Sequence, residues 1–153
     1  MTAPMIFSER PGFTHVGGLP TDIGPVVARL DGSRNSFMAL RAAVGHAMTR
    51  TCEMVVLDET GEPGFPFSAD VIDERERSVA AGILGNNHVS RLRVESPGLG
   101  EAIRRSVDLN ASLLVLNADD VARAMATPDI LAALLDTPCD VLMLAPGTMR
   151  NPG

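Results

Sequence analysis

Short apolar runs alternate with longer amphipathic stretches along residues 26–144, and this alternation most constrains the fold. The runs expected to form strands are 26–30, 54–57, 89–94, 113–116 and 141–144. The stretches with apolar residues at helical spacing are 36–48, 69–84, 99–109 and 119–135, the last one interrupted or restarted at Pro128. Strands that alternate with helices predict an α/β fold, a doubly wound parallel sheet with helices on both faces.

The chain divides into one domain and two flanking segments. Residues 1–25 are rich in proline and glycine and show no sustained period, so they predict an irregular N-terminal arm. Residues 26–146 form the predicted domain, and residues 147–153 form a C-terminal tail. Within the domain, Gly85–Asn86 predicts a left-handed helix cap.

Composition excludes several functional classes. All 13 basic residues are arginine, so a P-loop and Schiff-base chemistry, which both need lysine, are excluded. A net charge of −6 and the absence of Trp and Tyr argue against nucleic acid and anionic membranes as partners. No apolar run approaches the ~18 residues of a membrane span, and no signal pattern opens the chain, so we expect a cytoplasmic protein.

Four segments together resemble universal stress protein domains. They are VVARLDGSRNSFMALRAAVGHA from residue 26, GEAIRRSV from residue 100, ASLLVLN from residue 111 and TPCDVLML from residue 137. The resemblance implies a five-stranded sheet of order 3-2-1-4-5 and a homodimer. Some members of that family bind ATP and others do not.

The glycines that accompany ATP binding in the family are absent from this chain. The family pattern, Gly-x-x-Gly followed after nine residues by Gly-Ser or Gly-Thr, falls here on Asn117, Asp120 and Thr127–Pro128. Arg29 stands where the family often has proline. Asp119 and Asp120 are expected to cap the following helix with their own oxygens and to repel a triphosphate. We therefore expect no cofactor and disfavour ATP.

Four aspartates lie at the predicted carboxyl ends of strands: Asp31, Asp58, Asp119 and Asp120. In a doubly wound sheet these ends share one rim, where ligands bind. A metal or phosphotransfer site is one interpretation, but the ligand spacing and the lysine that would support it are missing. The favoured interpretation is that they are turn and helix-cap residues. If a ligand binds, the residues expected to line its site are Asp31, Gly32, Ser33, Leu57, Asn117 and Asp119.

Other reactive residue types favour structural roles. Ser33 and Ser36 open a helix and lack a positioned base, so we expect capping. The three histidines show no metal-ligand spacing, and no metal is expected. Cys52 and Cys139 are read as small buried residues.

The last predicted strand contains Val141, Leu142, Met143 and Leu144 and should lie at the edge of the sheet. A bare apolar edge needs to be covered or paired. The family resemblance implies pairing with a second copy, which we favour over coverage by the N-terminal arm.

The sequence thus predicts a homodimeric, non-catalytic regulatory or interaction module that does not bind ATP in the family manner, with a protein as its partner. One alternative is a small-ligand or nucleotide sensor with a remodelled pocket at the carboxyl ends of the first and fourth strands. A less favoured alternative is an enzyme, such as an ATPase or another hydrolase, on the same rim.

Overall fold

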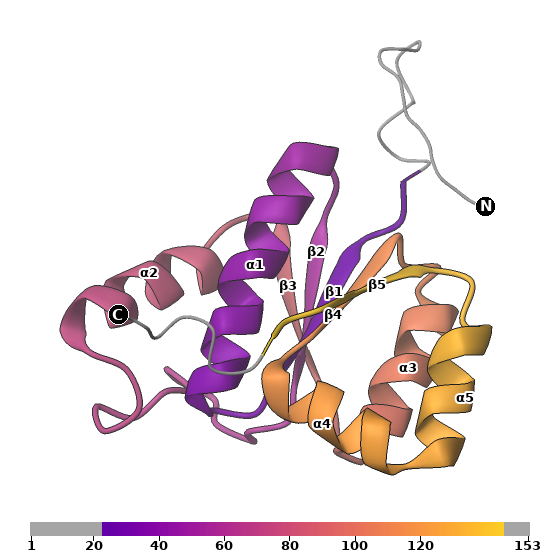
Figure 1. Ribbon diagram of the computed structural model, residues 1–153. Coiled ribbons are helices and arrows are strands. Elements are labelled where there is room, and N and C mark those ends of the chain that lie inside the picture. The colour runs from indigo at the N-terminus through magenta and orange to yellow at the C-terminus, as the bar shows by residue number, and fades with distance from the viewer. Residues whose placement is uncertain (1–22, 146–153) are drawn as a thin grey trace, which may run out of the picture.

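The computed structural model describes residues 23–145. Strands and helices alternate along this part of the chain (Figure 1). In chain order the elements are β1 Val26–Leu30, α1 Arg34–Arg50, β2 Met54–Asp58, α2 Glu74–Leu84, β3 Val89–Arg93, α3 Leu99–Asp108, β4 Leu113–Leu116, α4 Ala118–Ala126, α5 Pro128–Asp136 and β5 Asp140–Met143.

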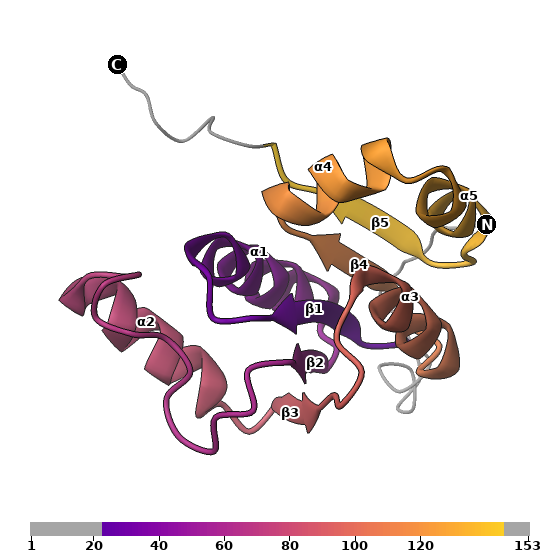
Figure 2. The ribbon, with the colours of Figure 1, turned by 90° about the horizontal axis from the view of Figure 1, so that it is seen from below.

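The five strands form one parallel sheet in the order β3-β2-β1-β4-β5, as the sequence predicted. The chain steps outward from β1 to β3 and then returns to β4 on the other side of β1. Because such crossovers are right-handed, this reversal places α1 and α2 on one face and α3 and α5 on the other (Figure 2). The fold is therefore the doubly wound α/β architecture.

Two apolar clusters form the core, one on each face of the sheet. Strand β1 is buried along its whole length and divides its side chains between them: Val26, Ala28 and Leu30 face α1, whereas Val27 faces α3. Strand β4 alternates in the same way. Burial on both faces explains why these strands read as continuous apolar runs in the sequence.

Helix α1 begins at Arg34 because Ser33 caps it, as predicted. The Ser33 hydroxyl accepts a hydrogen bond from the Ser36 N–H at 3.1 Å. The helix ends at Thr51, whose φ of 55° is left-handed. The cap fixes the direction in which α1 leaves the carboxyl end of β1.

Helix α2 is shorter than predicted, because it begins at Glu74 and not at residue 69. Asp73 and Glu76 form a reciprocal capping box: the Asp73 carboxylate accepts from the Glu76 N–H at 2.8 Å, and the Glu76 carboxylate accepts from the Asp73 N–H at 3.0 Å. Ile72 is buried in the turn before the helix. Because Ile72 is apolar and lies at helical spacing from the apolar residues of α2, the sequence pattern placed the start of the helix too early.

The end of α2, the start of α5 and the start of β5 agree with the sequence-based expectations to different degrees. Gly85 ends α2 with a φ of −91°, so the predicted left-handed cap is wrong. Pro128 restarts a helix at the first position of α5, which the sequence anticipated. Strand β5 begins at Asp140, one residue before the predicted start, and Leu144 lies just beyond it.

The structure describes little of the two segments that flank the domain. The predicted arm lies outside the described residues except for its last three, Ile23, Gly24 and Pro25, and the predicted tail lies outside them entirely. Within residues 23–145 no helix is both long and apolar enough to cross a bilayer. Cys52 and Cys139 are free and half-buried, and burial raises the pKa of both thiols.

Candidate functional site at the carboxyl ends of β1 and β4

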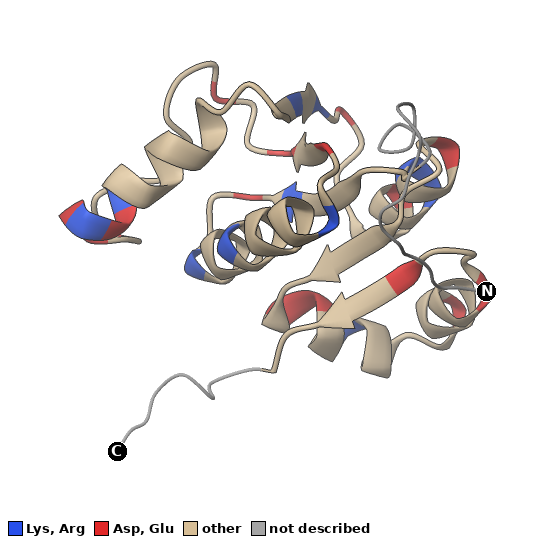
Figure 3. Ribbon diagram, turned by 90° about the horizontal axis from the view of Figure 1, so that it is seen from above, with Lys and Arg blue, Asp and Glu red and all other residues tan. Residues whose placement is uncertain are grey.

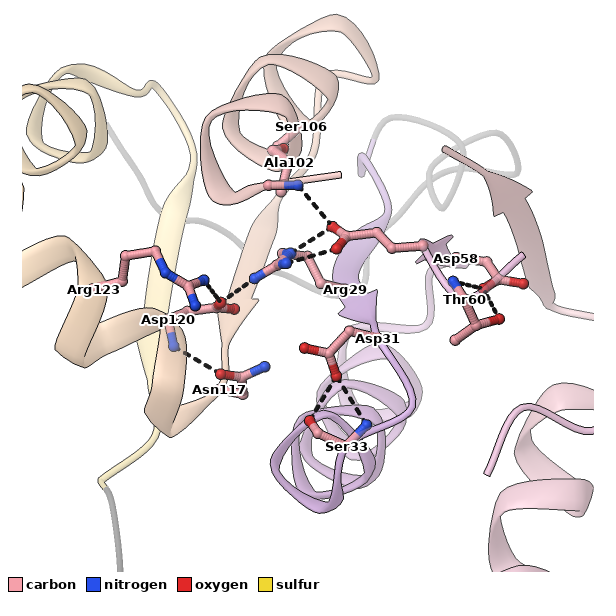
Figure 4. Close-up of polar contacts among 12 residues, drawn as sticks. Arg29, Asp31, Ser33, Asp58, Thr60, Ala102, Ser106, Asn117, Asp120 and Arg123 are labelled. Carbon is pink, nitrogen blue, oxygen red and sulfur yellow. Dashed lines mark hydrogen bonds and ion pairs between the residues drawn. The ribbon is translucent and has the colours of Figure 1, made fainter. Parts of the chain in front are cut away.

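Strands β1 and β4 are neighbours whose following helices leave on opposite faces of the sheet. This reversal of strand order is the place where open α/β sheets bind ligands. The turn from β1 into α1 forms one side of the site, and the junction of β4 with α4 forms the other (Figure 4). The candidate residues of both segments therefore lie on the same rim.

Asp31 stabilises the turn after β1. Its Oδ1 accepts hydrogen bonds from the Ser33 N–H at 2.9 Å and from the Ser33 hydroxyl at 2.6 Å. Burial raises the pKa of the Asp31 carboxyl, but the hydrogen bonds from Ser33 outweigh it and hold that pKa below its usual value. Gly32 has a φ of 87°, which suits glycine at this turn. Asp31 is thus an ionised turn residue at the rim.

At the start of α4 the capping residue is Asn117, so the expectation that Asp119 and Asp120 supply the cap is wrong. The Asn117 Oδ1 accepts from the Asp120 N–H at 2.8 Å. Asp119 is exposed in the first turn, whereas Asp120 is buried. Figure 3 shows this acidic segment at the beginning of α4.

The principal feature that the sequence did not predict is a buried ion-pair cluster, Arg29–Glu59–Asp120. From β1, the Arg29 Nε and Nη2 donate to the two Glu59 carboxylate oxygens, each at 2.7 Å. The Arg29 Nη1 donates to the Asp120 Oδ1 (Figure 4). The three side chains are at most 5% exposed. One guanidinium therefore ties the ends of β1 and β2 to the start of α4.

The electrostatics of the cluster differ between its two ends. Burial lowers the pKa of Arg29, but the hydrogen bonds that it donates to Glu59 and the charges of the nearby carboxylates outweigh burial and raise that pKa, so the guanidinium stays charged. Burial raises the pKa of the Asp120 carboxyl, and the attraction of Arg29 does not fully offset this. Arg123, whose Nη1 lies 3.8 Å from the Asp120 Oδ1, is a second cation beside this carboxylate, and burial still outweighs both cations.

Two buried polar atoms at this junction have no hydrogen-bond partner in the described part of the chain. They are the Asp120 Oδ2, an acceptor, and the Asn117 Nδ2, a donor. Buried polar atoms are almost always paired with protein or with ordered water. A group that both accepts and donates, such as water or a hydroxyl, would suit them.

The remaining predicted residues have structural roles. Leu57 is fully buried in the core on the α3 side. Asp58 Oδ1 accepts from the Thr60 N–H at 2.8 Å and the Thr60 hydroxyl at 2.6 Å, and its Oδ2 accepts from the Arg91 Nε at 2.7 Å. Among residues 23–145, no group of three or more His, Cys, Asp or Glu side chains is arranged to hold a metal ion.

One signal in the sequence could have revealed the cluster. Arg29 is a charged residue inside the apolar run VVARL, and a buried charge requires a partner. The partner could not be named, because Glu59 and Asp120 lie 30 and 91 residues further along the chain. Pairing at that distance depends on the packing of three separate elements.

Comparison of the sequence with family models and with curated proteins gave no match. Comparison of the structure with solved structures did give matches. A universal stress protein in complex with cAMP aligns with a TM-score of 0.53 at 18% identity, covering 79% of this chain and 96% of that chain. Universal stress family proteins from Burkholderia pseudomallei and Archaeoglobus fulgidus align with TM-scores of 0.48 and 0.46 at 24% and 17% identity. These alignments cover 79% and 78% of this chain, and 95% and 92% of those chains, respectively.

The first of these structures is aligned over nearly its whole length. At this level of identity, structural similarity defines the fold and leaves the ligand to be argued from this chain's own residues. The chain has the universal stress protein fold.

Proposed function

We propose that the protein is a non-catalytic regulatory or interaction module with the universal stress protein fold, and that its rim does not bind ATP. The observation that carries the proposal is the Arg29–Asp120 ion pair beside the Asn117 cap. These contacts fill the junction of β4 and α4, where glycine-rich relatives would bring their backbone to a phosphate.

A phosphate at a helix N-terminus needs free backbone N–H groups and no opposing negative charge. In this chain the Asn117 side chain already accepts the Asp120 N–H. Asp119 adds an exposed carboxylate to the same turn. One like-charge contact at about 4 Å and an effective dielectric near 20 costs roughly 4 kcal/mol. A triphosphate would meet this repulsion without the backbone N–H groups that usually bind its phosphates.

Catalysis at the rim is also disfavoured by the contacts of its carboxylates. Asp31 accepts two hydrogen bonds from Ser33, and Asp58 is held by Thr60 and Arg91. A general base needs an oxygen within hydrogen-bond reach of the proton that it removes. The Asp31 Oδ1 and both Asp58 oxygens are already committed to these contacts.

A small-ligand sensor is the second candidate, because one observation favours it. The Asn117 Nδ2, a donor, and the Asp120 Oδ2, an acceptor, are buried at the start of α4 without a hydrogen-bond partner among the described residues. One solved structure of this fold was determined with cAMP. A cyclic monophosphate carries less charge than a triphosphate, so it would meet less repulsion from Asp119.

We further propose that the module is a homodimer that pairs through the edge strand β5. The Leu144 N–H donates to the Leu116 oxygen of β4 at 3.1 Å. Alternate N–H groups of a strand point to opposite edges, so the Met143 N–H points outward. The Met143 side chain is 41% exposed. A second β5 could satisfy this open edge.

Calorimetric titration of Mg²⁺–ATP into the purified protein tests the proposed function, after mass spectrometry has shown that no ligand co-purifies. A flat titration supports an interaction module. A parallel titration with cAMP tests the sensor alternative, since saturable heat from cAMP alone would put that alternative first.

A further inference from the structure

The two faces of the sheet are covered unequally at its β5 end. Val141 of β5 packs with the core cluster that contains residues of α3, α4 and α5. Leu142 and Leu144 point to the opposite face and pack, only half-buried, against the cluster of α1. No helix of residues 23–145 packs broadly over that side of β5.

A groove of about 370 Å³ lies where this layer is incomplete. One wall is formed by four residues of α1: Asn35, Met38, Arg41 and Ala42. The last three follow Asn35 by three, six and seven residues, so all four lie along one face of the helix. The facing wall includes Ala118 and Leu144. The floor and walls are therefore mainly apolar, with polar groups on α1 at the rim.

Arg41 gives this groove a positive charge. The side chain is exposed, and among the described residues its guanidinium takes part in no ion pair or hydrogen bond. Its guanidinium carbon lies 5.8 Å from the centre of the Phe37 ring, and its charge also acts on Glu76 of α2. None of the residues that line the groove is acidic. An occupant with a carboxylate would find a charge partner here.

We propose that this groove docks an amphipathic helix of a partner protein, with apolar residues against Met38, Ala42 and Leu144 and a carboxylate on Arg41. A helix fits better than a strand, because the space beside α1 is the one that a further helix of the same layer would fill. Helices pack side by side at about 8–10 Å, with apolar anchors at i, i+3, i+4 and i+7. The proposal rests on the proposed function, since it names the docking face of the interaction module.

The test uses the full-length protein and a displayed library of helical peptides. Each peptide has one apolar face of Leu, Ile and Ala and varied charge at the flanking positions. Selected peptides are then measured by fluorescence anisotropy against the wild type, Arg41→Gln, Ala42→Leu and the control Arg75→Gln. Arg75 is an exposed arginine of α2 and does not line the groove.

We expect the selection to enrich peptides with Asp or Glu beside the apolar face. Ala42→Leu, which fills the groove, should weaken binding about tenfold or more. Arg41→Gln should weaken it about three- to fivefold and only for peptides that keep the carboxylate. Arg75→Gln should match the wild type. Unchanged urea midpoints would show that the variants are folded.

Several results would overturn the docking proposal. One is that the selection enriches no peptide. Another is that the selected peptides bind Ala42→Leu as tightly as the wild type. A third is that Arg41→Gln and Arg75→Gln weaken peptide binding equally. Decanoate that binds in an Arg41-dependent way when no peptide does would assign the groove to a small amphiphilic anion and reject the helix. Failure of the proposed function is seen separately, as ATP binding, whatever the peptides do.

Discussion

At the residue scale, the main feature is Arg29 and the two carboxylates that it joins. The guanidinium is buried in β1 and contacts one residue after β2 and another at the start of α4. Removing one partner of a buried ion pair leaves an uncompensated charge, which costs far more than the loss of a surface pair. Arg29 therefore links three elements at the rim.

Replacing Arg29 with Gln should lower the free energy of unfolding by about 3–5 kcal/mol, because Glu59 would remain buried without its cation and Asp120 would keep only the exposed Arg123, 3.8 Å away. Arg104→Gln is the matched control, since Arg104 is 60% exposed in its ion pairs on α3. It should cost at most about 1 kcal/mol. Urea denaturation measures both values. Equal losses in the two variants would show that the buried cluster contributes little.

Asp58 should make part of the stability depend on acid pH. Burial raises the pKa of Asp58, but the hydrogen bonds from Thr60 and Arg91 outweigh it, so its folded-state pKa lies below the usual value. The unfolded chain then binds the proton more readily. The stabilisation is present above the unfolded pKa of about 3.9 and is lost as the pH falls through the folded pKa.

Asp58→Asn should therefore be less stable than the wild type by about 1–3 kcal/mol at pH 7, and this gap should narrow as the pH falls below about 4. The comparison is urea unfolding at pH 7, 4 and 3, with Asp70→Asn as an exposed control. A gap that stays constant across this range would contradict the assignment.

The residue scale is also where the sequence was least informative. The turn role of Asp31 and the cap at Ser33 could be predicted, because both depend on neighbours within three residues. The Asn117 cap was missed because three polar residues close together offered equivalent candidates. The Arg29 cluster was out of reach because its partners come from distant segments.

At the scale of elements, local signals fixed most boundaries and tertiary packing shifted the rest. Strand β4 and the restart of the helix at Pro128 agree with the sequence pattern, because a buried run and a proline act locally. The start of α2 was placed too early because Ile72 is buried by a turn and not by a helix. The capping box at Asp73 and Glu76 was the better signal.

If that capping box defines α2, Asp73→Ala should cost about 1 kcal/mol of stability. Amide hydrogen exchange should also speed up in the first turn of α2, where the Glu76 N–H loses its acceptor. Asp70→Ala, three residues earlier and outside the helix, should change neither quantity. Equal behaviour of the two variants would argue that packing alone sets the start of α2.

At the scale of the whole molecule, the alternation of elements predicted a parallel α/β sheet, and the resemblance to universal stress proteins implied its strand order. The structure confirms both. The oligomeric state does not follow from the fold of one chain, because it depends on which surface packs against the open edge of β5. The outward Met143 N–H and the half-covered α1 side of β5 make this end of the sheet the place where partners are expected.

Met143→Pro should abolish pairing through β5, because proline removes the outward N–H and spares the bond from Leu144 to β4. Multi-angle light scattering should then report the mass of a monomer, or the protein should become insoluble. Met143→Ala keeps the N–H and should retain the dimer mass. A dimer of unchanged mass in the proline variant would rule out the β5 edge as the interface.

We propose that the Arg29–Asp120 pair and the Asn117 cap close the rim between β1 and β4 to a triphosphate. Isothermal titration of Mg²⁺–ATP into ligand-free wild-type protein tests it most directly. We expect no saturable heat at millimolar nucleotide. Heat that saturates at one nucleotide per chain would contradict it and would mean that this rim holds ATP without the glycines.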